Sequence, residues 1–183
     1  MSAVVVYRSQ TGSARMYAQW LAESLTCAVA PVENIDEAAH EADLVILSGW
    51  FHAASLKGSR ELKAYMAKHP EKHYAVVAVG ATPMPSKDWP AAEHEEAFRR
   101  SFPSAQYPDL PWCYCRGRFF FDQLNALDKI AMRVYFRMLE SAARKGSKRD
   151  SAALEGMRRG FDACDRSYLE PLLDELRARK WID

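Results

Sequence analysis

The chain has 183 residues, of which 49% are hydrophobic and 27% are charged, and its formal net charge at pH 7 is +1. This length suits one domain with a sizeable core, and the composition excludes a disordered chain. A nearly neutral chain gives no reason to expect a nucleic-acid partner. No apolar run approaches the ~18 residues of a membrane span, and the first one is too short for a signal peptide. We therefore expect a cytoplasmic protein.

Five strand-like runs alternate with helix-like segments. The third and fourth runs are almost continuously apolar, as is typical of strands covered on both faces. This alternation predicts an α/β fold, in which a doubly wound parallel sheet has helices on both faces and the strand order 2-1-3-4-5. The expected strands are Ala3–Tyr7, Cys27–Val32, Asp43–Ser48, Tyr74–Gly80 and Trp112–Gly117.

Apolar residues at 3.6-residue spacing predict the helices between these strands. In residues 91–102 the pattern predicts a polar surface helix, with His94 on its solvated face. The expected buried stripes are Ala14, Tyr17, Ala18, Leu21, Ala22 and Leu25 in the first helix and Leu62, Tyr65 and Met66 in the helix after the third strand.

No metal site is predicted from the cysteines and histidines. Cys113 and Cys115 share one face of an expected strand, and buried, reduced structural thiols are favoured there over a redox or metal role. His69 and His73 do not predict a zinc pair, because Pro70 breaks a continuous helix between them.

The segment Ser9–Ser13 joins the first strand to the first helix, where ligands bind in such sheets. Gly12 permits close approach of the backbone. The hydroxyls of Ser9, Thr11 and Ser13 and the first N–H groups of the helix are expected to converge on one anion. The alternative is a helix cap, which Ser and Thr often form. The motifs of P-loop hydrolases, dinucleotide sites and G-x-S-x-G nucleophiles are absent from the sequence.

The stretch YRSQTGSARMYAQWLAESL resembles the phosphate loop and first helix of flavodoxins, whose pattern is [ST]-x-T-G-x-T. The resemblance implies a flavodoxin-like fold and a loop that wraps the phosphate of FMN. Ala14 departs from the pattern, and the lost hydrogen bond would contribute ~0.5–1.5 kcal/mol, for which the charges of Arg8 and Arg15 are candidates to compensate. The matching positions are Ser9, Gln10, Thr11, Gly12, Ser13 and Ala14.

Two further loops are expected to hold the flavin ring. The resemblance implies that the loop Ser48–Ser59 flanks the isoalloxazine, with Trp50 and Phe51 stacking on it and His52 donating a hydrogen bond. The alternative is that both aromatic residues simply cover the sheet. The loop Gly80–Pro90 is implied to contact the other side of the ring through its backbone. The implied ring residues are Ser48, Gly49, Trp50, Phe51, His52, Gly80, Ala81 and Thr82.

Residues 114–150 are similar to a segment that is inserted after the fifth strand in flavodoxin-like proteins related to bacterial FMN- and quinone-dependent protoporphyrinogen oxidases. We expect a single domain, 1–183, with an extra helical segment at about 118–150. Its helix, near 124–140, is apolar over most of its circumference. It is expected either to lie between the sheet and the last helix, or to serve as a lid, a homodimer contact or a peripheral membrane contact. Arg116 and Arg118 are hypothesised to hold a substrate carboxylate.

Three functions remain open from the sequence. The first is an FMN-dependent oxidoreductase acting on a small, hydrophobic or quinone-type substrate, in which the flavin rather than a side chain carries the chemistry. The second is a flavodoxin-type electron carrier between partner proteins, although such carriers are typically acidic. The third is a flavin-free interaction module on the same fold, to which Ala14 points.

Overall fold

The computed structural model describes residues 1–52 and 55–183. These residues form two compact units, and each is described by itself. The core unit comprises residues 1–117 and 164–183, and the inserted unit comprises residues 118–163.

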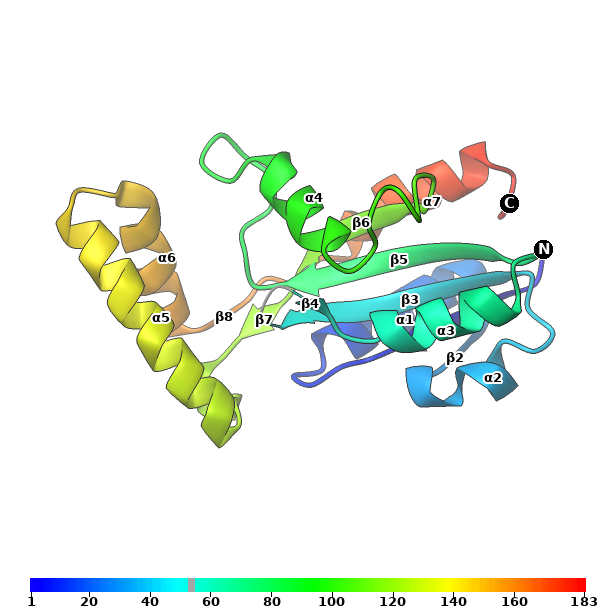
Figure 1. Ribbon diagram of the computed structural model, residues 1–183, viewed down its shortest axis with the longest axis horizontal. Helices are drawn as coiled ribbons and strands as arrows, with labels where there is room; N and C mark the ends of the chain where they lie inside the picture. The colour runs from blue at the N-terminus through cyan, green and yellow to red at the C-terminus, as the bar shows by residue number, and fades with distance from the viewer. Residues whose placement is uncertain (53–54) are drawn as a thin grey trace. The chain divides into compact units, whose positions relative to one another are not determined.

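The core unit is built on a parallel sheet (Figure 1). Its main strands lie in the order β2-β1-β3-β5-β6, which confirms the predicted order 2-1-3-4-5. A short sixth strand, β4, pairs antiparallel with the end of β3. The strands are β1 (Ala3–Tyr7), β2 (Ala28–Pro31), β3 (Leu44–His52), β4 (Ser55–Leu56), β5 (His73–Gly80) and β6 (Trp112–Arg116).

Helices cover both faces of this sheet because successive strand residues point to opposite sides. On one face, Val5 and Ile46 pack with α1 and α7, and on the other, Val4 and Val45 pack with α2, α3 and α4. The helices of the core unit are α1 (Ser13–Leu25), α2 (Ile35–Ala38), α3 (Ser59–Lys68), α4 (Ala91–Arg99) and α7 (Glu170–Ala178), with 3-10 turns at η1 (Val32–Asn34) and η3 (Arg166–Leu169).

The helical stripes read from the sequence are confirmed as buried faces. In α1, the stripe from Ala14 to Ala22 is buried, and in α3, Leu62 and Tyr65 are buried. The leucines of the last helix, such as Leu172 and Leu176, pack directly against the sheet and α1. This direct packing leaves no intervening layer, so the expectation that another helix would separate the last helix from the sheet is wrong.

The third strand is longer than predicted. The sequence ended it at Ser48, but β3 continues to His52 and its Trp50 pairs with Val79 of β5. The turn that follows brings β4 back onto β3, and the amide of Lys57 donates to the carbonyl of Trp50 at 2.9 Å. Residues 48–52 are therefore strand, held on both edges, rather than a loop.

The inserted unit is a helical hairpin closed by a short antiparallel ladder. Its first and last strands pair Arg118 with Asp162, whose side chains form an ion pair of 3.0 Å, and Phe119 with Phe161. The two helices pack through a buried side that includes Leu139 and Leu154. The elements are β7 (Arg118–Phe119), η2 (Phe121–Gln123), α5 (Ala126–Arg144), α6 (Lys148–Arg159) and β8 (Phe161–Asp162).

Tyr17 of α1 connects the two places where the core unit is interrupted. Its hydroxyl donates to the carbonyl of Arg116 at 2.6 Å and accepts from the amide of Asp165 at 3.0 Å. Burial raises the pKa of Tyr17 above its ordinary value, so the hydroxyl keeps its proton across the usual pH range.

We predict that Tyr17→Phe lowers the free energy of unfolding by about 1–3 kcal/mol, because the amide of Asp165 and the carbonyl of Arg116 lose the hydroxyl that they share. Urea denaturation followed by circular dichroism measures the change. Tyr107→Phe is the matched control, since in the described residues no hydrogen bond of the Tyr107 hydroxyl is found, and it should change stability by less than ~0.5 kcal/mol. Equal effects of both substitutions would contradict the bridging role of Tyr17.

Candidate functional site

The carboxyl ends of the central strands meet at one edge of the sheet, where ligands bind in open α/β folds. The amide of Arg8, directly after β1, donates to the carbonyl of Ser48 in β3 at 3.0 Å. The amide of Gly117, directly after β6, donates to the carbonyl of Gly80 at 2.8 Å. Segments 8–13, 48–52, 80–82 and 116–117 therefore surround one edge of the core unit.

The loop 9–13 has the backbone geometry of an anion site. Gly12 is the N-cap residue of α1, with φ +89° in the left-handed region that favours glycine. No side chain caps α1, and its first turn carries no acidic residue. The N–H groups at the start of α1 therefore face no carboxylate of their own turn, and the helix dipole favours an anion there.

The hydroxyls of this loop have different environments. Ser9 Oγ is buried and has no hydrogen-bond partner among the described residues. Ser13 is buried beside Gly117, at which an added Cβ would lie only 3.1 Å from the Ser13 side chain. An unsatisfied buried hydroxyl costs about 1–3 kcal/mol. A ligand oxygen that replaced the missing partner would recover this cost. The residues present therefore fit a phosphate group. Of the remaining loop positions, Thr11 is half-buried and Gln10 is exposed.

Ala14 and the two nearby arginines are already engaged in the fold. Ala14 is buried in the apolar cluster beneath α1, and its carbonyl accepts from the hydroxyl of Ser48 at 2.7 Å. Arg8 forms an ion pair with Glu33. The guanidinium of Arg15 lies over the ring of Tyr7, 5.9 Å from its centroid. Within the described residues no ion pair of Arg15 is found, so Arg15 is better placed than Arg8 to add positive charge.

The aromatic residues of β3 divide between the two faces of the sheet. Trp50 packs on the α1 face, with its ring centroid 5.2 Å from that of His52, whereas Phe51 packs on the opposite face, 6.5 Å from Tyr114. Trp50 and Phe51 therefore cannot stack together on one side of a planar ligand. Gly49 lies against the carbonyl of Lys57, where a Cβ would be 2.4 Å away. Residues 53 and 54 of the expected loop lie outside the described residues.

The segment that follows β5 is held by Tyr114 and His94. The hydroxyl of Tyr114 donates to the carbonyl of Thr82 at 2.6 Å, and His94 Nε2 lies 2.9 Å from the carbonyl oxygen of Pro83. The rings of Tyr114 and His94 are 4.2 Å apart. Gly80 faces this pair, since an added Cβ would lie 2.8 Å from the Tyr114 hydroxyl.

The expectation for His94 is wrong. The sequence placed it on a solvated helix face, but it is only 5% exposed and faces the loop 80–90. In α4, His94 and Phe98 are four residues apart and share the buried side. That i, i+4 spacing was the available signal, and the surrounding glutamates obscured it.

The two candidate substrate residues belong to different units. Arg116 ends β6 in the core unit, and Arg118 begins β7 in the inserted unit, where Asp162 neutralises it. Both guanidinium Nε atoms are buried. Neither arginine can therefore be treated as a simple surface charge.

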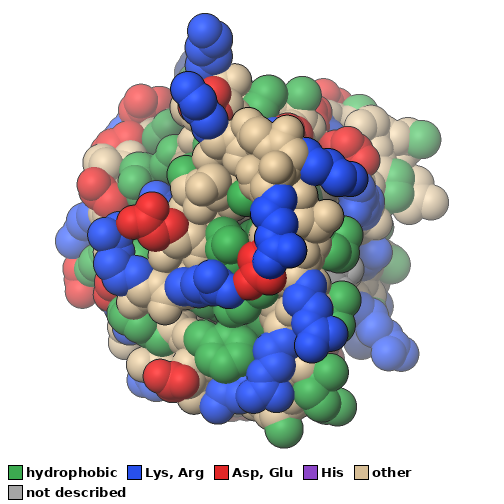
Figure 2. Space-filling model, turned by 90° about the vertical axis from the view of Figure 1, so that its left-hand side faces the viewer, with side chains coloured by type: hydrophobic (Ala, Val, Ile, Leu, Met, Phe, Trp, Pro, Cys, Tyr) green, Lys and Arg blue, Asp and Glu red, His purple; other side chains and the backbone are tan. Residues whose placement is uncertain are grey.

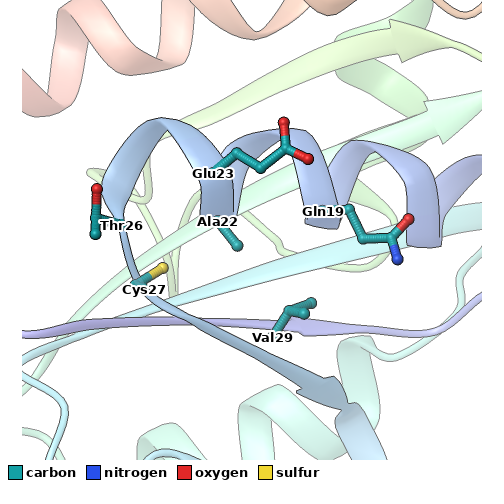
Figure 3. Close-up of a pocket in the computed structure, with 6 residues that line it drawn as sticks. All are labelled: Gln19, Ala22, Glu23, Thr26, Cys27 and Val29. Carbon is teal, nitrogen blue, oxygen red and sulfur yellow. The ribbon is translucent and has the colours of Figure 1, made fainter.

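A pocket of about 530 Å³ lies away from this edge, at the other end of α1 (Figure 3). Burial raises the pKa of the Cys27 thiol, so a smaller fraction of this thiol is present as the reactive thiolate. The nearest lining residue, Gln19, is seven residues after Gly12, which places it about 10 Å along the helix axis from the start of α1. Its lining residues are Gln19, Ala22, Glu23, Thr26, Cys27 and Val29.

Two features are absent from the described residues. No group of three or more His, Cys, Asp or Glu side chains in residues 1–52 and 55–183 could hold a metal ion. In that same part of the chain, no helix combines the length and apolar character needed to cross a membrane.

Cys113 and Cys115 share one strand face as predicted, with their sulfur atoms 3.7 Å apart.

We predict that Tyr114→Phe loosens the loop 80–90, because the carbonyl of Thr82 loses its hydrogen bond from the buried ring. Amide hydrogen exchange in residues 80–90 should become about tenfold faster, which corresponds to ~1.4 kcal/mol, while exchange in α1 stays unchanged. Mass spectrometry of peptic fragments gives the comparison, with Tyr107→Phe as the control. Unchanged exchange in both segments would contradict the anchoring role.

Comparison with known proteins places this geometry in a family. Residues 4–145 match the family model described as "Flavodoxin domain". Among solved structures, similar chains include a flavodoxin, WrbA-like protein from Agrobacterium tumefaciens (14% identity, TM-score 0.48, covering 79% of this chain and 98% of that one). Another is an FMN-dependent NADH-azoreductase from Bacillus anthracis str. Ames Ancestor in complex with FMN (9% identity, TM-score 0.41, covering 80% and 100%).

A third similar structure is a flavodoxin from the domain Archaea, with 20% identity, a TM-score of 0.37, and coverage of 55% of this chain and 75% of that one. A search of curated protein sequences finds no match. The family match covers most of the chain and includes β1, the loop 9–13 and the strand ends around it. The chain belongs to the flavodoxin domain family.

Proposed function

We propose that this protein binds FMN with its phosphate in the loop 9–14 and acts as an FMN-dependent oxidoreductase. The observation that carries the proposal is the start of α1. It combines a left-handed Gly12, a first turn that no side chain caps, and a buried Ser9 hydroxyl that has no partner in the part of the chain that the structure describes. Binding of an anionic phosphate would account for all three features. Membership of the flavodoxin domain family supports the same cofactor.

The residues expected around the ring have separate tasks in this proposal. Backbone groups of Gly80, Ala81 and Thr82 would line one side, in a loop held by Tyr114 and His94. Trp50 and His52 share one sheet face and are the candidates for the other side. Phe51 packs on the opposite face and is better suited to supporting Tyr114 than to touching the ring. The hydroxyl of Ser48 is committed to the carbonyl of Ala14, so it orients α1 instead of binding FMN.

Bound FMN would supply transfer of electrons or hydride, and the protein would bind it, orient it and limit the access of water. We infer a small, hydrophobic or quinone-type substrate rather than a protein redox partner. Two observations support this choice, namely the net charge of +1 and the inserted unit with its apolar helix. A relationship to the protoporphyrinogen oxidase branch stays a prediction, as does a role for Arg116 and Arg118 in binding a substrate carboxylate.

We predict that the purified protein, mixed with FMN, shows a bound-flavin absorption spectrum and quenches FMN fluorescence. Gly12→Asp should weaken FMN binding at least about tenfold, because its carboxylate would occupy the anion site at the start of α1. The matched control is Gly146→Asp. Gly146 also has a left-handed backbone, with φ +94°, but lies in the inserted unit with no atom near its Cβ position.

The control separates backbone strain from lost binding, because both variants place the same residue in the same backbone region. Equal loss of FMN binding in the two variants would contradict the phosphate loop. A wild-type protein that neither changes the FMN spectrum nor quenches its fluorescence would overturn the cofactor proposal and favour the flavin-free module, to which Ala14 points.

We predict that the reduced, FMN-loaded protein is reoxidised directly by a soluble quinone, and that it transfers electrons to cytochrome c poorly when coupled to a reductase. Stopped-flow absorbance measures the first reaction, and cytochrome c reduction measures the second. Fast transfer to cytochrome c with no quinone turnover would favour the electron carrier.

Replacing Arg116 and Arg118 with Ala should reduce turnover of a carboxylate-bearing substrate, and unchanged turnover would exclude their proposed role.

A further inference from the structure

The inserted unit presents an apolar helix face to solvent. On α5, five large hydrophobic side chains are exposed although the helix also has a buried side. At 100° per residue these five lie on one continuous face, and the buried Leu139 and half-buried Phe136 lie on another. The exposed side chains are Leu127 (79%), Ile130 (57%), Val134 (54%), Tyr135 (38%) and Met138 (64%). We call them the α5 apolar face.

The buried side of α5 already has its partners within the unit. Phe136 packs against Phe121 with ring centroids 5.7 Å apart, and Leu139 is buried where α5 and α6 meet. Glu140 is paired with Arg158 of α6. The folding of the helical hairpin therefore does not use the α5 apolar face.

Positive charge accompanies this face. The inserted unit holds ten Lys and Arg against six Asp and Glu, a net charge of +4, whereas the remaining residues have a net charge of −3. Arg133, Arg137 and Arg144 are all exposed and, by their helical spacing, border the α5 apolar face along one edge. Figure 2 shows one face of the molecule, on which Lys and Arg side chains lie around hydrophobic ones.

We propose that the α5 apolar face docks onto an anionic membrane surface. An amphipathic helix with apolar side chains on one face and arginines along its edge lies in the plane of the headgroups, where the arginines meet lipid phosphates. From Leu127 to Met138 the face extends about 16 Å along one convex helix. A fluid bilayer accommodates such a ridge, whereas a protein partner would need a matching groove. Tyr135, at the margin of the face, suits the interface between water and hydrocarbon.

A second copy of the chain fits this face less well than a lipid surface does. Two inserted units would bring together two net charges of +4, and like charges repel. In the described residues, the acidic groups of the unit are largely engaged. Glu140 pairs with Arg158, Asp162 pairs with Arg118, and Asp150 accepts from the Ser147 hydroxyl at the start of α6. A membrane supplies the negative charge that a second copy lacks.

The test measures co-sedimentation of the full-length protein with sucrose-loaded vesicles. We expect binding to phosphatidylcholine vesicles that contain about 30% phosphatidylglycerol, and weak binding to phosphatidylcholine alone. Raising NaCl from about 50 mM to about 500 mM should reduce binding severalfold, because salt screens the arginines. Ile130→Gln/Val134→Gln should reduce the partition coefficient about tenfold or more, since these side chains provide the apolar contact.

Arg137→Gln/Arg144→Gln should reduce binding to the anionic vesicles about tenfold. Its matched control, Arg60→Gln/Lys180→Gln, removes two exposed positive charges from the core unit and should leave binding nearly unchanged. Equal losses in both charge variants, or no binding of the wild type to either vesicle at low salt, would overturn the proposal.

Two further measurements identify other occupants of the face. A dimer in sedimentation velocity that Ile130→Gln/Val134→Gln converts to a monomer would show that a second copy covers it. A melting temperature lowered by several degrees in that variant would show that the face is buried within the chain. Either result would overturn membrane docking. None of these readouts depends on FMN, so the proposal can fail or succeed independently of the proposed cofactor.

Discussion

The hydroxyl of Tyr17 is the contact on which the organisation of the core unit depends. The chain leaves this unit just after Arg116 and re-enters it just before Asp165, and one buried hydroxyl bonds the backbone at both places. The ring is held edge-on by Trp20, with centroids 5.3 Å apart. Because burial raises its pKa, Tyr17 stays neutral, which lets the same oxygen donate to the carbonyl and accept from the amide.

This contact explains how the sheet tolerates an insertion at the carboxyl ends of its strands. An inserted unit is accepted when its two ends lie close together on an intact scaffold. The short ladder between Arg118 and Asp162 brings those ends together on the side of the insertion. On the side of the core, Tyr17 holds them from α1, the helix that also begins at the loop 9–13. The loop 9–13 and the base of the insertion therefore share one helix as their support.

The sequence indicates the candidate site and the α5 apolar face in two different ways. The loop 9–13 is local, since a strand, a glycine, hydroxyls and a helix follow one another within about a dozen residues, and local order is enough to recognise it. The sequence pattern shows that the α5 helix is apolar over most of its circumference, but it does not say which side is buried. Contact with Phe121 and α6 decides this, because those partners cover Phe136 and Leu139 and leave Ile130 and Val134 exposed.

The sequence by itself determined the five main strands and the buried stripes of α1 and α3, because apolar runs and the 3.6-residue period are properties of the chain. The alternation of strands with helices, together with the rules for parallel sheets, was enough to predict the strand order. The sequence also determined the position of Gly12 between a strand and a helix. Only the tertiary structure decided where the side chains of Trp50, Phe51 and His94 lie. Extending β3 beyond Ser48 sent Trp50 and Phe51 to opposite faces, since side chains alternate along a strand. His94 became buried because the ring of Tyr114, in β6, packs against it and the carbonyl oxygen of Pro83 lies 2.9 Å from its Nε2.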